Sequence, residues 1–285
     1  MEQWFWLTLL ATLLFGIQNF LYKISAAKKQ DSSTVTFASM TFVSIASIVL
    51  FFISGAKIQN LSFLLWISLI SGLTMVATSI TKIEGLKHIP TNIFYPIIKA
   101  SIAFALIASL FIFNETLAVK DWIGITLIIF VIYLVSVQEK KHRIKNLKLG
   151  LILAIVCTIS NGIGGVLQKF AVQKVNYNNF LGMSYIYAIF ISLIFMNLTR
   201  TKVKAKKNIK SSLIMGVIIG MFIFAGFLAL LKALVTGPIG IISPITNLSF
   251  VIPIIMGALI YKEKLTTRKI IALILSIIAI VIFEI

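Results

Sequence analysis

A lysine within an apolar stretch is the residue best placed to act on a solute. Lys99 lies about eight residues into a predicted helical span over positions 91–113, or about 12 Å along a helix that rises 1.5 Å per residue. An ammonium group at that depth costs several kcal/mol unless it faces water, a partner or an anionic substrate. The alternative is a long side chain that reaches back to the membrane surface. If Lys99 faces a cavity, it should attract a carboxylate or a phosphate.

Uncharged polar residues in other apolar segments accompany Lys99. Asn247 occupies the position equivalent to Lys99 in the repeat described below. Any single Asn or Gln could serve only in hydrogen bonds between helices, but polar groups at two equivalent positions favour a shared cavity. The residues expected to line this substrate-binding cavity are Lys99, Tyr95, Asn247, Asn161, Gln18 and Asn19.

Acidic residues and catalytic motifs do not support other kinds of chemistry. The chain has eight Asp and Glu residues, all near predicted helix ends or in loops. Proton-driven export of cations usually needs an acid near the middle of the bilayer, so that mechanism is disfavoured. No His-Glu-x-x-His, Gly-x-Ser-x-Gly, Cys-x-x-Cys or phosphate-binding glycine loop with Lys occurs. We therefore expect no enzyme activity, no cofactor and no metal site.

The elements that must position these residues are membrane-spanning helices. Apolar residues make up 59% of the chain and charged residues only 12%, whereas a soluble domain carries about 25% charged residues. Apolar runs of roughly 20 residues, enough to cross a bilayer core as helices, fill nearly the whole length. We predict an all-α integral membrane protein. Its ten expected spans are 4–22, 35–53, 63–83, 91–113, 122–137, 149–170, 179–198, 211–234, 239–261 and 268–283.

The second half of the chain repeats the first. We therefore predict two domains, residues 1–145 and 146–285, with five helices each. An odd number of helices per repeat places the second copy upside down in the membrane, and such inverted repeats commonly build transporters around the interface between their halves. The matched pairs include Gly16 with Gly162, Lys23 with Lys169, Pro90 with Pro238, Pro96 with Pro244, Lys99 with Asn247, Ser101 with Ser249, and Glu115 with Glu263.

Two of these pairs lead to specific structural expectations. Pro96 and Pro244 each remove a helix hydrogen bond, so we expect the fourth and ninth spans to bend there, as hinges or as fixed kinks. Glu115 and Glu263 each stand between two predicted helices. A carboxylate in that place can cap the N-terminus of the following helix.

The basic residues are distributed unevenly between the loops. The chain has 26 Lys and Arg against 8 Asp and Glu, a net charge of +18. Most of the basic residues follow the odd-numbered spans; Lys82 and Lys87 are counted after the third. The loops after the even-numbered spans hold few basic residues, and Lys169 is counted with these. By the positive-inside rule the basic loops face the cytoplasm. This places both termini outside the cell membrane and explains the charge without a nucleic-acid partner.

Short motifs resemble those of the EamA family in the drug/metabolite transporter superfamily. Phe15-Gly16-x-x-Asn19-Phe20-x-x-Lys23 is similar to the first-helix pattern of that family. Asn114-Glu115-x-Leu117, followed by Gly124, resembles the signature that closes its fourth helix, and Lys262-Glu263-x-Leu265 repeats that signature. In this chain Asn114 and Lys262 stand where Gly is usual, and Ala272 stands where the counterpart of Gly124 should be. The resemblance implies ten helices in two inverted repeats and a central substrate cavity formed by helices 1, 3, 4, 6, 8 and 9.

These observations together predict a secondary transporter of a small polar metabolite, such as an amino acid or an anionic metabolite. We expect an exporter or an exchanger that works by alternating access. The alternative is a channel or a non-transporting membrane scaffold: a channel would move solute without saturation, and a substrate would not stabilise a scaffold. The expected partners are the small-molecule substrate and the lipid bilayer, and the sequence leaves a monomer and a homodimer equally open.

Overall fold

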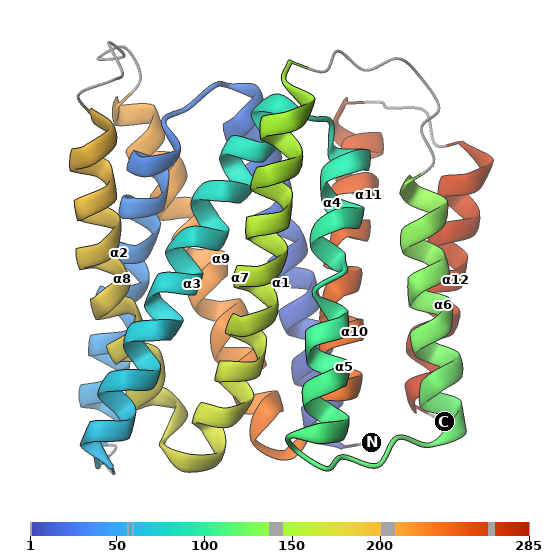
Figure 1. Ribbon diagram of the computed structural model, residues 1–285, viewed down its shortest axis with the longest axis horizontal. Helices are drawn as coiled ribbons and strands as arrows, with labels where there is room; N and C mark the ends of the chain where they lie inside the picture. The colour runs from blue at the N-terminus through green and yellow to red at the C-terminus, as the bar shows by residue number, and fades with distance from the viewer. Residues whose placement is uncertain are drawn as a thin grey trace.

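The described residues of this computed structural model form helices joined by short connections, and no strand occurs among them. The description covers residues 2–55, 57–58, 60–136, 145–200, 209–261 and 266–284. The helices lie side by side, roughly along one common direction (Figure 1). They are α1 (Gln3–Ala27), α2 (Ser32–Ser54), α3 (Leu61–His88), α4 (Thr91–Lys99), α5 (Ile102–Phe111), α6 (Val119–Ser136), α7 (Leu147–Lys174), α8 (Tyr177–Arg200), α9 (Ile209–Thr236), α10 (Ile239–Asn247), the 3₁₀ turn η2 (Leu248–Phe250), α11 (Val251–Tyr261) and α12 (Thr267–Glu284).

The described helices have the lengths and surfaces of membrane spans. Seven segments are long and apolar enough to cross a bilayer by length and composition; they are α1, α2, α3, α7, α8, α9 and a segment that joins α4 to α5. Two shorter apolar segments lie over Ile239–Pro253 and Ile270–Phe283. Large apolar side chains, including Trp66, Phe111 and Leu259, are exposed on the bundle. Such a surface suits lipid rather than water.

Several helices continue past their predicted ends, α3 and α7 among them. The sequence predicted that the third span ends at residue 83 and the sixth at residue 170, but α3 runs to His88 and α7 to Lys174. Charged residues near the end of an apolar run do not stop a helix. The α3 helix stops where Ile89, which precedes a proline, adopts an extended backbone conformation. Lys82 lies inside α3, so counting its charge with the following loop was wrong.

The fourth and ninth predicted spans are broken. Pro96 and Pro244 lie inside α4 and α10, and the regular helical hydrogen-bond pattern breaks about one turn later. There the backbone N–H of Ala100 donates to the carbonyl of Ile97 at 3.1 Å, in the tighter pattern of a 3₁₀ turn. The same pattern follows α10, which leads directly into η2.

A threonine from the opposite half of the chain contacts each break. Thr158 Oγ1 lies 2.9 Å from the carbonyl oxygen of Ile97 and 2.8 Å from that of Ala154 in its own helix, so the two carbonyls share one hydroxyl proton. Thr12 Oγ1 lies 3.4 Å from the carbonyl oxygen of Ile245 and 2.7 Å from that of Thr8. Thr12 and Thr158 occupy equivalent positions in the two halves, as do Ile97 and Ile245. The carbonyls of Ile97 and Ile245 also accept the backbone N–H groups of Ala100 and Leu248, so each threonine adds a second contact at its break. We infer that these contacts between the halves favour breaks about one turn after the prolines.

Replacing Thr158 with valine tests this account. The change keeps the shape of the side chain but removes the donor to Ile97, so we expect the free energy of unfolding to fall by about 1 kcal/mol. Denaturation of the purified protein in detergent measures the effect. The control is Thr126→Val, because Thr126 is exposed and bonds only within α6; a change within about 0.5 kcal/mol is expected there. Equal effects of the two substitutions would contradict the capping role.

Helices of the two halves pack against each other throughout the bundle. The α1 helix packs on α9, α3 packs on α7 and α8, and α2 packs on α8 and α9, while α6 pairs with α12 at one side (Figure 1). Glycines permit some of these contacts: a Cβ at Gly216 of α9 would lie 2.5 Å from the carbonyl oxygen of Val35 in α2. The first and last helices have their free ends at the same end of the bundle (Figure 1).

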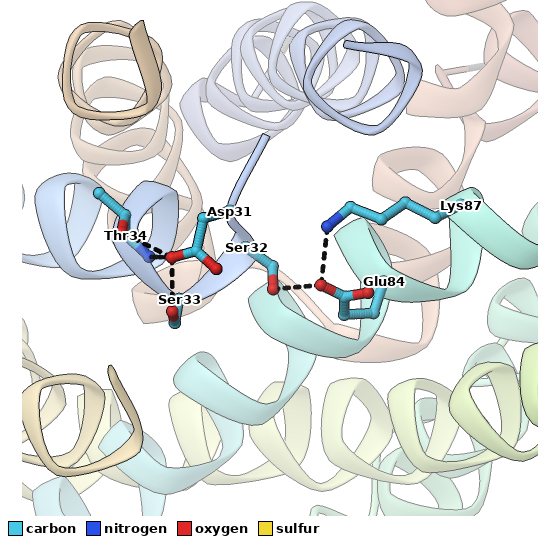
Figure 2. A network of polar contacts seen from close by, with 6 residues as sticks. All are labelled: Asp31, Ser32, Ser33, Thr34, Glu84 and Lys87. Carbon is cyan, nitrogen blue, oxygen red and sulfur yellow. Dashed lines mark hydrogen bonds and ion pairs between the residues drawn. The ribbon is translucent and has the colours of Figure 1, made fainter. Parts of the chain in front are cut away.

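A polar network joins the start of α2 to the end of α3. Asp31 accepts the backbone N–H of Thr34 at 2.8 Å and so caps α2. Partial burial raises the pKa of Asp31, but hydrogen bonds from Ser33 and Thr34 outweigh it, so the net effect is a lowered pKa. Glu84 of α3 accepts Ser32 Oγ at 2.5 Å and Lys87 Nζ at 2.8 Å. Figure 2 shows the six members, which are Asp31, Ser32, Ser33, Thr34, Glu84 and Lys87.

Candidate functional site

A cavity of about 170 Å³ lies between the two halves of the chain. Helices α1, α3, α4 and α5 from the first half and α7, α8, α9 and α10 from the second half contribute to its wall. The volume is enough for several water molecules or one small metabolite. Polar side chains from both halves reach it, so the cavity is suited to a hydrated or polar solute.

Five of the six residues expected to line a cavity do so: Lys99, Asn247, Asn161, Gln18 and Asn19. Tyr95 is not among the lining residues. Its side chain is buried, and its hydroxyl donates to the backbone carbonyl of Asn19 at 3.0 Å. Tyr95 therefore lies behind the wall and ties α4 to α1, because the backbone of α1 satisfies its only polar atom.

Lys82 is a lining residue that the sequence analysis missed. Its Nζ donates to Oδ1 of Asn19 at 3.3 Å and lies 5.3 Å from the centre of the Tyr22 ring. The prediction ended the third span at residue 83, one residue after Lys82, and counted this charge with the cytoplasmic loop that follows. Taking Pro90 as the stop signal of the helix would have placed Lys82 about two turns inside α3.

Hydrogen bonds connect Lys82 to Lys99 through two residues from different halves. Asn19 Nδ2 donates to Ser249 Oγ at 3.2 Å, and Lys99 Nζ donates to the same oxygen at 3.3 Å. Together with the bond from Lys82 to Asn19, they form a chain that we call the two-lysine chain: Lys82, Asn19, Ser249 and Lys99. Lys99 is only 7% exposed. The chain joins α1, α3 and α4 of the first half to the break between α10 and α11.

Among the described residues, the charged side chains that line the cavity are all basic. Lys82 and Lys99 line it, and no Asp or Glu of the described chain does so. Two ammonium groups in a protein interior are costly unless water or an anion compensates them. Their combined field therefore attracts anions and repels cations.

Ser101, in the break between α4 and α5, also accepts a hydrogen bond from an asparagine. Ser101 and Ser249 occupy equivalent positions in the two halves, and Ser101 Oγ accepts the amide of Asn161 from α7 at 3.0 Å. The amide of Asn247 instead donates to the carbonyl of Ser243 in its own helix at 2.9 Å. Each break thus has an asparagine of α1 or α7 bonded to its serine, which joins both breaks to the cavity wall.

Glu115 links the two halves beside the cavity. Its carboxylate accepts the backbone N–H groups of Ile239 at 2.9 Å and of Gly240 at 3.0 Å, and it lies 3.5 Å from Lys169 Nζ. Glu115 therefore caps α10 of the other half. The sequence predicted instead that it would cap the helix that follows it along the chain. The first turn of α6 is served by Asp121, which accepts the backbone N–H of Ala118. The matching Glu263 lies outside the described residues.

Lys169 takes part in the same contact between the two halves. It is buried inside α7, not in a loop, and its Nζ donates to the carbonyls of Leu234 at 3.0 Å and Gly237 at 2.7 Å. These carbonyls belong to the C-terminal end of α9, where a positive charge is favourable. Leu234 and Ile239 also line the cavity. The Glu115–Lys169 pair thus holds the turn between α9 and α10 against the first half at the cavity wall.

Comparisons with known proteins agree with this architecture. The model of the EamA-like transporter family matches residues 3–137 and again residues 148–284. One solved structure, described as "Crystal structure of protein", is similar with a TM-score of 0.75 and 14% sequence identity over 96% of this chain and 98% of that chain, which shows a shared fold. A search of curated proteins found no match. The chain therefore belongs to the EamA-like transporter family of the drug/metabolite transporter superfamily and contains two copies of the family's repeat.

Proposed function

We propose that this protein is a secondary transporter of a small metabolite that carries an anionic group. The observation that carries the proposal is the two-lysine chain in a cavity between the halves, with no acidic side chain among the described lining residues. Amino acids and other carboxylates or phosphates have the chemistry that such a site recognises. Transport would be export or exchange across the cell membrane.

The course of the helices supports two inverted five-helix repeats, residues 1–145 and 146–285. In Figure 1, α1 and α7 run in opposite directions between the two ends of the bundle, and so do α2 and α8, and α3 and α9. The contacts also match, because α1 packs on α9 as α7 packs on α3. If α4–α5 and α10–α11 each cross as one broken span, the chain crosses the membrane ten times. The positive-inside rule then places both termini outside.

Alternating access would use the two breaks as hinges. Lys99 is the last residue of α4, and Ser249 lies within η2. The bond between them therefore connects both breaks directly. An anion that draws Lys99 away from Ser249 would change the support of both breaks at once. Binding energy could in this way bias the bundle between two conformations.

Transport assays test the proposal. Purified protein in liposomes would be given labelled amino acids, monocarboxylates, sugar phosphates and organic cations. We expect saturable uptake of an anionic or zwitterionic solute, faster when the same solute is loaded on the far side, and no uptake of the cations. Uptake without saturation or counterflow would indicate a channel. No uptake, and no solute that raises the melting temperature, would indicate a scaffold.

A further inference from the structure

The cavity wall is bare at one position of α7. Gly165 lines the cavity, and a Cβ built on it would meet no atom within 4 Å. Asn161 and Gln168, four residues before and three after, also line the cavity, so position 165 lies on the same face of the helix. The free space at Gly165 therefore belongs to the cavity.

The neighbouring glycines of α7 are different. A Cβ at Gly162 would lie 2.5 Å from the ring of Phe104, and a Cβ at Gly164 would lie 3.1 Å from Thr74 Oγ1. Those two glycines allow α7 to approach other helices closely. Packing gives no such reason for a glycine at position 165.

The repeat makes this bare position more informative. Gly165 is equivalent to Asn19, because Gly16 is equivalent to Gly162 and the two stretches run in step. In the first half this position carries the amide that joins Lys82 to Ser249. In the second half it carries no side chain. The two halves therefore contribute differently to the cavity. The first half supplies the lysines, and the second half leaves free space at Gly165.

The rest of the cavity wall includes apolar groups. Phe15, Ile223 and Phe227 line the cavity, and the rings of Phe15 and Phe227 contact each other edge to face with centroids 5.7 Å apart. Aromatic and aliphatic surfaces of this kind bind apolar parts of a ligand. An inorganic anion would leave them without a partner.

We propose that Gly165 is a specificity-determining residue that sets the largest apolar portion the substrate can have. The substrate is then an organic anion or zwitterion whose charged group binds the two-lysine chain and whose apolar portion occupies the space beside Gly165. This inference rests on the proposed transport function. It narrows the substrate class to amphiphilic solutes, such as carboxylates with an apolar chain or amino acids with an apolar side chain.

A series of substitutions tests the inference. Gly165→Ala, Gly165→Leu and Gly165→Phe would be compared with the unchanged protein for binding and uptake of two graded sets: straight-chain monocarboxylates from acetate to octanoate, and amino acids from glycine to phenylalanine. We expect the longest accepted solute to become shorter as the new side chain grows. Affinity for the longest solute should fall at least tenfold in Gly165→Leu, while affinity for the shortest accepted solute should change less than twofold.

Stability measurements separate this effect from misfolding. Because alanine favours helix over glycine and has free space here, Gly165→Ala should keep or raise the melting temperature. The control is Gly216→Ala, a position that does not line the cavity and whose Cβ would collide with the carbonyl oxygen of Val35; it should lower the melting temperature without any dependence on solute length. A uniform loss across all lengths, or no change in the Gly165 series, would overturn the role of Gly165. If the unchanged protein binds no member of either set but takes up a sugar phosphate in liposomes, this inference fails while the proposed function stands. If it takes up no anionic or zwitterionic solute, both fail.

Discussion

Replacing Glu115 with glutamine is expected to lower the free energy of unfolding by about 3–5 kcal/mol, the range observed when one partner of a buried ion pair is removed. The side chains of Glu115 and Lys169 are 12% and 7% exposed. Glutamine would leave Lys169 as an uncompensated charge and would satisfy fewer of the N–H groups at the start of α10. Denaturation in detergent, followed by tryptophan fluorescence, measures the change. Trp4 is a suitable reporter because its ring lies against Gly237, in the turn between α9 and α10.

A double-substitution cycle identifies the source of that loss. Lys169→Met in the Glu115→Gln background removes the second charge as well, so the double variant should be more stable than the sum of the single effects predicts, by about 1–3 kcal/mol. The matched control is Asp121→Asn, since Asp121 is a buried acid that accepts the backbone N–H of Ala118 within its own turn; a loss of about 1 kcal/mol is expected. Strict additivity in the cycle would show that Glu115 and Lys169 do not act as a pair.

Replacing either cavity lysine with glutamine is expected to weaken binding of the transported anion by about 30-fold or more. Truncating one partner of a buried charge-assisted contact costs about 2 kcal/mol or more, and each 1.4 kcal/mol is a factor of ten. The double variant, Lys82→Gln with Lys99→Gln, should show no saturable uptake. Initial rates in liposomes and ligand-dependent shifts of the melting temperature measure the two effects independently.

Two controls make the lysine prediction specific. Lys57→Gln removes an exposed charge in the connection between α2 and α3, so it should leave affinity unchanged. Lys99→Arg keeps the charge but changes its shape, so it should retain part of the binding that Lys99→Gln loses. If Lys99→Gln transports every accepted solute at the original rate and with the original preference, Lys99 is not part of an anion site.

The sequence predicted well those features that depend on short stretches of chain. Apolar runs of sufficient length made the protein all-helical, and the motifs around Asn19 and Glu115 pointed to the EamA family, which the family match confirms. Lys99 could be selected because it lies far from both ends of its apolar run. Lys82 was counted as a loop charge because it lies close to the end of the apolar run, and the stop signal at Pro90 was not used.

Other details depend on which helices meet, and no local pattern contains that information. Tyr95 and Lys99 are four residues apart, yet only Lys99 reaches the cavity, because the backbone of α1 takes the hydroxyl of Tyr95. Glu115 lies just before α6 along the chain but caps α10, because the turn between α9 and α10 presents free N–H groups there.

Composition and repetition along the chain were therefore enough to indicate a duplicated, helical membrane transporter, because the hydrophobic effect acts on each apolar segment separately. The contacts between the halves decided where the helices break and how the charges of the site are arranged. Ser249 contacts a lysine far away in the sequence, and only their approach in space gives Lys99 this partner. In a membrane interior, where water is scarce, such partners determine which polar groups can be buried.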